Sequence, residues 1–206
     1  MDPSPPATTR AVRGKEDDYV PIARLFALTD GVAAIALTLL VLEIKLPSGL
    51  QGAALDHALD ETWAEVGALT LSAVVIALFW RVHHTSMRGA VQVDTGLFWL
   101  NVAFLALLSL LPFPTSALQD YADRPLGPAL YGGAVGVTAL VLYAIAVRVR
   151  LRAGERPGTV ALPAQALVFL ASAGIAQFSP AAAMYSWAAA VPLAALADRL
   201  ARRPGG

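Results

Sequence analysis

The stretch Arg24–Lys45, RLFALTDGVAAIALTLLVLEIK, decides the fold of this chain. Between Gly31 and Leu42 every side chain is apolar or small except that of Thr38, whereas charged residues stand near both ends of the stretch. An uncharged middle of this length with charged ends predicts a helix that crosses a membrane. Asp30 departs from the pattern. Because an ionisable side chain inside such a helix is costly, we expect Asp30 to face protein or water rather than lipid.

The composition of the whole chain also indicates a membrane protein. Of its 206 residues, 57% are hydrophobic and 15% are charged, which is unusual for a soluble domain of this size. The formal net charge is zero, so nothing points to nucleic acid or to an acidic partner. Cysteine is absent, which excludes disulfides and thiol chemistry. Residues 1–20 contain prolines and charges but no apolar run, so we expect a disordered cytoplasmic tail and not a signal peptide.

Apolar segments recur along the chain and predict an all-α membrane domain of six transmembrane helices between residues 21 and 198. Pro112 and Pro114 predict a kink near the end of the third helix. Gly132 and Gly136 form a G-x-x-x-G spacing in the fourth helix, which permits close helix contact in lipid. A basic cytoplasmic tail over 199–206 follows the last helix. The expected helices cover 21–44, 63–84, 95–118, 127–147, 159–178 and 181–197.

The distribution of positive charge predicts how these helices are oriented. Six helices place both termini on the same side of the membrane, and the side richer in Lys and Arg is normally cytoplasmic. Only Lys45 and Arg124 fall on the opposite side. We therefore expect both termini in the cytoplasm, on the side that carries Arg10, Arg13, Lys15, Arg24, Arg81, Arg88, Arg148, Arg150, Arg152, Arg156, Arg199, Arg202 and Arg203.

Polar residues on the first three helices fall at a similar depth. Arg24 and Asp30 lie in the cytoplasmic part of the first helix, because that helix enters from the cytoplasm. Trp80 and His84 lie at the cytoplasmic end of the second helix and share one face, since they are four residues apart. Asn101 lies about two turns into the third helix. We expect Asp30, Trp80, His84 and Asn101 to form a hydrogen-bonded cluster that satisfies groups which lipid could not.

Three roles are open for this cluster: a structural lock between helices, a proton relay, or a metal site. His83 and His84 are adjacent and point about 100° apart on a helix, so they do not easily chelate one ion. The chain has no cysteine and no H-E-x-x-H pattern. It also lacks a G-x-S-x-G elbow, a P-loop and a dinucleotide fingerprint, so we expect neither an enzyme nor a cofactor. The residues favour the structural lock.

One face of the first helix carries an apolar stripe. Ile35, Leu39 and Leu42 stand at positions i, i+4 and i+7, and Thr38 flanks them. Asp30 points about 140° away from the stripe. One side of the first helix can therefore pack on the second and third helices through Asp30, while the stripe on the other side faces a different environment. Periodicity alone favours ordinary packing on the bundle or on lipid. An apolar stripe that lines a pore is the alternative, because hydrophobic constrictions gate by dewetting.

The opening of the first helix, RLFALTDG at 24–31, resembles the R-x-x-x-F-S-D motif of the transmembrane protein 175 family of potassium channels. Leu28 stands in place of the motif's Phe and Thr29 in place of its Ser, so the hydroxyl is kept and an aromatic group is lost. Further blocks keep the family's order and spacing through the third helix: TLLVLEIKLP at 38–47, FWRVHH at 79–84, Asn101, and LPFPT at 111–115.

The resemblance to the family's bacterial, single-repeat branch implies a six-helix subunit that assembles into a homotetramer. The first helices would line the pore, which has a hydrophobic constriction and no carbonyl filter of the TVGYG type. The family's constriction positions fall on Ile35, Leu39 and Leu42, with Thr38 nearby. Its structural polar network falls on Arg24, Thr29, Asp30, Trp80, His84 and Asn101.

We therefore expect a potassium-preferring cation channel in the plasma membrane. Its partners would be further copies of the chain and the lipid bilayer, and its permeant ligand would be the potassium ion. The alternatives are a proton-coupled secondary transporter that uses Asp30 and His84 as a relay, and a non-conducting membrane scaffold. Transporters of this class usually show internal repeats and broken helices, and the sequence shows neither.

Overall fold

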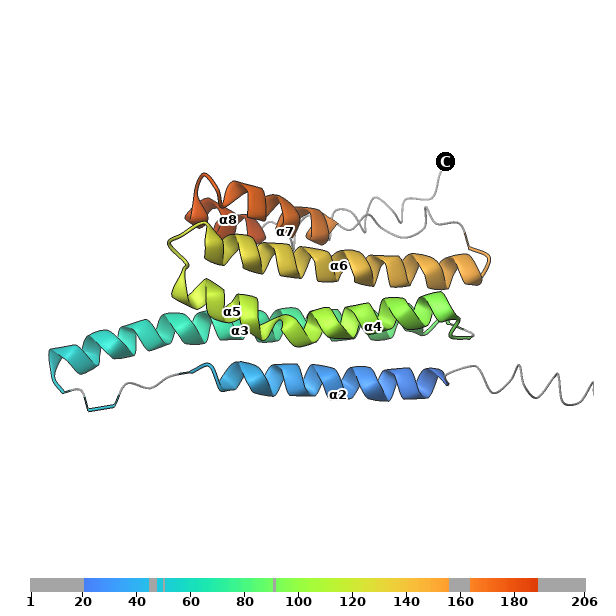
Figure 1. Ribbon diagram of the computed structural model, residues 1–206, viewed down its shortest axis with the longest axis horizontal. Helices are drawn as coiled ribbons and strands as arrows, with labels where there is room; N and C mark the ends of the chain where they lie inside the picture. The colour runs from blue at the N-terminus through green and yellow to red at the C-terminus, as the bar shows by residue number, and fades with distance from the viewer. Residues whose placement is uncertain (1–20, 45–47, 50, 91, 156–163, 189–206) are drawn as a thin grey trace, which may run out of the picture.

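The computed structural model describes residues 21–44, 48–49, 51–90, 92–155 and 164–188. Within these residues the chain is entirely helical, with no strand. Figure 1 shows α2 below, α3 to α5 in the middle, and α6 to α8 above. The helices are α2 (Ile22–Val41), α3 (Ala53–Met87), α4 (Thr95–Leu110), α5 (Pro112–Asp120), α6 (Leu126–Arg152), α7 (Ala164–Ile175) and α8 (Pro180–Trp187).

Within the described part of the chain, four helical segments are long and apolar enough to cross a membrane: Ile22–Val41, Glu65–Met87, Thr95–Asp120 and Leu126–Arg152. They correspond to the first four helices expected from the sequence. The apolar helix α7 is shorter, at 12 residues. The ranges expected for the last two helices, 159–178 and 181–197, lie partly outside the described residues, so only their parts in α7 and α8 are visible.

The second helix is longer than the apolar pattern predicted. It begins at Ala53, ten residues before the expected start at Trp63, and its first turns extend beyond the other helices in Figure 1. Residues 53–62 contain no glycine or proline, and Asp56 lies in the first turn, where a negative charge favours the helix dipole. Hydropathy marks the part of a helix that lies in lipid, whereas helix propensity determines how far the helix continues into water.

The third apolar segment divides into two helices at the expected prolines. Helix α4 ends at Leu110 and α5 starts at Pro112, with Leu111 between them. The nitrogen of Pro112 carries no hydrogen, so the α-helical bond at that position is missing and the helix axis changes direction. Both helices pack on α6, and apolar sequence long enough to cross a membrane runs through both, so they act as one span with a break, Thr95–Asp120.

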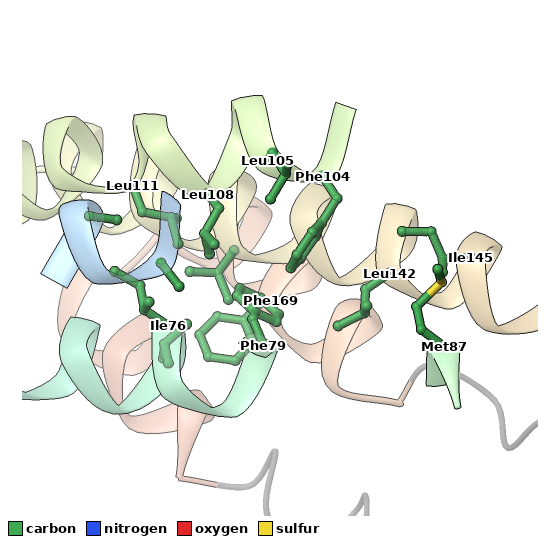
Figure 2. Packing of buried hydrophobic residues seen from close by; sticks show 14 of the residues in the cluster. Ile76, Phe79, Met87, Phe104, Leu105, Leu108, Leu111, Leu142, Ile145 and Phe169 are labelled. Atoms are coloured by element: carbon green, nitrogen blue, oxygen red, sulfur yellow. The ribbon is translucent and has the colours of Figure 1, made fainter. Parts of the chain in front are cut away.

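A single hydrophobic core joins the layers, and it lies where α3, α4 and α6 meet. Ile76 of α3, Phe104 and Leu108 of α4, and Ile145 of α6 are completely buried. The ring of Phe79 meets that of Phe104 edge to face, with centroids 6.4 Å apart. Figure 2 shows these side chains pointing into the space between the helices. The core thus holds α3 and α4 in place between α2 and α6.

The G-x-x-x-G spacing in α6, which permits a close helix contact, lies where α6 meets α7. A Cβ atom on Gly132 would overlap the hydroxyl of Ser172 and lie 2.8 Å from the carbonyl oxygen of Phe169. A Cβ atom on Gly136 would lie 2.6 Å from Cγ of Leu170. All three of these neighbours belong to α7, so the two glycines let the α7 backbone approach α6 directly.

Candidate functional site

Helix α2 has two distinct faces. The buried face packs on α3 and α4 through Leu25, Thr29, Ala33, Ala36 and Leu40. The small residues on this face let α2 approach its neighbours closely. The Thr29 hydroxyl donates to the carbonyl oxygen of Leu25 at 2.9 Å, so this buried polar group is satisfied within its own helix. Thr29 therefore contributes to packing and has no side-chain partner on another described helix.

The opposite face of α2 carries the apolar stripe, and none of the residues that the structure describes covers it. Ile35 is 60% exposed, Leu39 is 40% exposed and Leu42, just beyond the last helical residue, is 74% exposed. Thr38 lies among them, and its hydroxyl donates to the carbonyl oxygen of Ile35 at 2.8 Å. Leu28 continues the surface toward the start of the helix and is 50% exposed. Such a contiguous apolar surface indicates an interface with another chain, a pore or lipid.

Asp30 lies at the edge of α2 next to α3, where the sequence placed a polar cluster. Trp80 donates its indole N–H to Oδ1 of Asp30 at 2.7 Å. Nε2 of His84 lies 3.3 Å from the same oxygen, and Nδ1 of His84 lies 3.3 Å from the carbonyl oxygen of Trp80. Phe26 stacks on the His84 ring with centroids 4.7 Å apart. His84 thus hydrogen-bonds the backbone of α3 through one ring nitrogen and approaches the Asp30 carboxylate of α2 with the other.

Asn101 is not part of this cluster, contrary to the sequence prediction. Its Oδ1 lies 2.7 Å from Nε2 of His83, and both residues are buried. The His83 ring also stacks on Phe104 with centroids 5.0 Å apart. The two histidines point to different helices because adjacent residues are about 100° apart around α3. His84 therefore meets α2, and His83 meets α4.

A periodic signal could have identified His83 as the partner of Asn101. Ile76, Phe79, His83 and Met87 are spaced by three, four and four residues, and all four are buried. This spacing defines one face of a helix, and the apolar members mark it as the face toward the core. A histidine on such a face needs a buried partner, which Asn101 of α4 supplies.

Arg24 stands apart from both of these polar groups. It lies in the first turn of α2 and is exposed. Its side chain forms no hydrogen bond or ion pair with another residue of the described ranges. The resemblance placed Arg24 in the polar network together with Asp30. In the single chain, the network visible at this level consists of Asp30, Trp80 and His84.

A second polar group, which the sequence did not indicate, connects the start of α4 to the end of α6. Asp94 caps α4 by accepting from the backbone N–H of Leu97 at 2.8 Å. Arg148 donates to both carboxylate oxygens of Asp94 at 3.0 Å, and Arg152 also pairs with it. A Cβ atom at position 96 would overlap the Arg148 guanidinium, so Gly96 leaves room for this arginine. The hydrogen bonds from Arg148 lower the pKa of Asp94 to about 2.

A third polar group, also missed from the sequence, lies within the bundle. The hydroxyls of Ser72 and Thr115 lie 2.8 Å apart, and that of Ser72 lies 3.2 Å from the Tyr131 hydroxyl. These residues come from α3, α5 and α6, and all three are buried. The group locks three helices together. Among the described residues no three His, Cys, Asp or Glu side chains form a cluster that could hold a metal ion.

The fold and site define a class: an all-helical, multi-pass membrane protein whose first span turns an apolar face away from its own bundle. Residues 24–112 match the family model described as endosomal/lysosomal potassium channel TMEM175. The chain is similar to the TMEM175 family over this stretch, and the curated relatives described below are bacterial. The family resemblance found in the sequence is therefore confirmed.

Two curated relatives are named potassium channels. One, from Streptomyces collinus, is 36% identical over 60% of this chain and 59% of its own length. Another, from Chamaesiphon minutus, is 35% identical over 57% of this chain and 61% of its own length. The chain thus aligns with about three fifths of each of these relatives.

A solved structure extends the comparison to most of the fold. It is described as a crystal structure of a lysosomal potassium-selective channel TMEM175 homolog from Chamaesiphon minutus. It matches with a TM-score of 0.68 and 25% identity, and the match covers 85% of this chain and 97% of that chain. The agreement in fold therefore reaches well beyond residues 24–112.

Proposed function

We propose that this protein is a potassium-preferring cation channel whose pore is lined by α2. The observation that carries the proposal is the uncovered apolar stripe of Ile35, Leu39 and Leu42 on a helix that is otherwise packed into the bundle. The names of the bacterial relatives support the same activity. No enzymatic step is part of this proposal.

A single copy of α2 cannot enclose a pore, so the proposal requires several copies. A closed ring of identical subunits is the usual solution for soluble and membrane homo-oligomers, and we propose a homotetramer around α2. In this arrangement α6 to α8 lie on the outside, because α3 and α4 separate them from α2. The polar contacts of Asp30 with Trp80 and His84 would fix the rotation of α2 so that the stripe faces the centre.

The stripe has the size and chemistry of a hydrophobic constriction. Ile35 and Leu42 are seven residues apart, which corresponds to about 10 Å along the helix. Apolar side chains offer no oxygen ligands to an ion that sheds its water, so a narrow ring of them raises the barrier to entry. Thr38 would supply hydroxyls at the same level. Potassium would pass more easily than sodium because it releases its hydration water at a lower cost.

We further propose that each subunit crosses the plasma membrane six times with both termini in the cytoplasm. Among the described residues, the Arg side chains at the start of α2, the end of α3 and the end of α6 gather at one end of the bundle. Only Arg124 lies at the other end within those ranges. The positive-inside rule assigns the basic end to the cytoplasm.

Ion flux into liposomes tests the pore assignment. Replacement of Ile35 by Asn in every subunit places amides at the constriction, so we expect faster potassium flux and a weaker preference over sodium. Val41→Asn is the matched control, because Val41 is 64% exposed on the same helix but points about 120° away. Equal flux through Ile35→Asn and unchanged protein, with assembly intact, would mean that this face does not line the path.

The same liposomes separate the proposal from its rivals. The 3.3 Å contact between Asp30 and His84 is the feature that a proton-coupled transporter would use. A transporter would move potassium only in exchange for, or together with, protons, whereas a channel conducts down the potassium gradient alone. A non-conducting scaffold would give no potassium flux, with or without a proton gradient. Flux that disappears without a proton gradient would overturn the channel proposal.

A further inference from the structure

A hollow lies at the less basic end of the bundle, beside the turn that connects α5 to α6. Its volume is about 620 Å³, and it is open to the outside. Tyr121, Arg124 and Pro125 come from the turn, Leu126 and Leu130 from the first two turns of α6, and Gln177 from the segment after α7. The hollow therefore combines an apolar wall with polar groups at its rim.

Arg124 gives the rim its positive charge. Its guanidinium lies over the Tyr121 ring at 6.0 Å from the centroid. Within the described ranges its side chain has no carboxylate partner, in contrast to Arg148 and Arg152 at the basic end. The neighbouring residue Asp123 lines a different hollow, together with Ser179 and Met184. The cation is thus free to receive an anionic group.

An exposed apolar track runs from this hollow along α6. Leu126, Leu130, Val137 and Leu140 are between 37% and 51% exposed and share one side of the helix. Gly133 lies among them, and a Cβ atom there would meet nothing within 4 Å, so the track has a notch. From Leu126 to Leu140 the track is about 21 Å long, which suits an extended acyl chain.

The depth of the hollow matches that of a lipid headgroup. Helix α6 is long and apolar enough to span a membrane and begins at Leu126, so Arg124 stands just outside the apolar segment. Basic groups at this level attract lipid phosphates. We propose that the hollow binds an anionic glycerophospholipid, with its phosphate on Arg124 and one acyl chain on the track along α6. That α6 faces lipid rests on the proposed assembly around α2, whereas lipid binding itself does not require conduction.

Photo-crosslinking of the full chain in liposomes tests this site. The probe is phosphatidylglycerol with a diazirine in its acyl chain, and labelled peptides are mapped by mass spectrometry. We expect adducts on residues 121–140. Arg124→Ala should reduce them by about fivefold, the typical effect of one basic residue at a membrane surface. Arg124→Lys should keep most of the labelling, and Leu130→Asn should also lower it.

The matched control is Arg88→Ala, which removes the same charge from an exposed residue at the opposite end of the bundle. It should leave adducts on 121–140 unchanged. Equal labelling in Arg124→Ala and unchanged protein would overturn the proposal. Full competition by soluble glycerol 3-phosphate would also overturn it, since the site would then take a free phosphate ester. Because labelling is measured without flux, its failure is distinguishable from failure of the channel proposal.

Discussion

At the scale of single residues, the polar side chains of this protein are divided among separate tasks. Asp30, Trp80 and His84 join α2 to α3 at a partly exposed edge. His83 and Asn101 form a buried pair between α3 and α4. Because the Asp30 group joins α2 to α3 and the His83–Asn101 pair joins α3 to α4, the neighbouring residues His83 and His84 fix different helix contacts. Removal of His84 would therefore loosen the contact between α2 and α3, whereas removal of His83 would loosen that between α3 and α4.

Asp94 gives a testable pH dependence at this scale. Its pKa is lowered from 3.8 to about 2 by hydrogen bonds from Arg148, so the ionised form is favoured in the folded protein. Its contribution to stability is complete above pH 3.8 and is lost as the pH falls through about 2. The group is partly exposed, so the contribution should be about 1 kcal/mol or less.

The measurement compares the thermal midpoint of unchanged protein with that of Asp94→Asn in detergent from pH 5 down to pH 2. Asparagine still caps α4, so the variant isolates the charge. The difference between the two midpoints should shrink as the pH falls. The exposed Asp123→Asn should show no such pH-dependent difference. A constant difference for Asp94→Asn at every pH would contradict the prediction.

At the scale of elements, the contact between α6 and α7 depends on two glycines. Gly132→Ala would push a methyl group against the carbonyl oxygen of Phe169 at 2.8 Å, so the helices would have to separate. We expect a loss of about 1–3 kcal/mol in stability. Gly133→Ala is the control, because a Cβ atom there meets nothing within 4 Å and alanine is the better helix former.

Thermal unfolding in detergent, followed by helical circular dichroism, reads out both glycine variants. Gly132→Ala should lower the midpoint by several degrees, and Gly133→Ala should leave it unchanged or raise it slightly. Equal effects of the two variants would mean that the loss comes from helix propensity and not from the close contact. The contact between α6 and α7 would then contribute less to stability than the short distances indicate.

At the scale of the whole molecule, the position of α2 in the proposed assembly is open to a direct test. The chain contains no cysteine, so single-cysteine variants report one position without background. Leu42→Cys lies on the exposed stripe, and neighbouring subunits around a central axis would bring its copies close together. Oxidation should therefore produce covalent dimers on a denaturing gel.

Leu130→Cys is the control for this experiment, because α6 lies in the layer on the far side of α3 and α4 from α2. It should remain monomeric under the same oxidation. Cross-linking of Leu130→Cys but not of Leu42→Cys would place α6 at the centre of the assembly. That result would remove the basis for a pore lined by α2.

The sequence by itself determined the first four spans and the break at Pro112, and it showed that Gly132 and Gly136 permit a close helix contact. Each of these follows from local rules: apolar length sets a span, proline removes a backbone donor, and glycine removes a Cβ atom. The spacing of apolar residues likewise revealed the stripe of α2, and helix geometry gave the angle between the stripe and Asp30.

Tertiary structure alone decided which side chains meet. Asn101 pairs with His83 rather than with the Asp30 group, and Asp94 binds Arg148 from 54 positions away. Sequence spacing gives the direction of a side chain around its own helix, but it does not give the rotation of the neighbouring helix. That rotation is set by how all the buried side chains pack together, and only the folded chain contains this information.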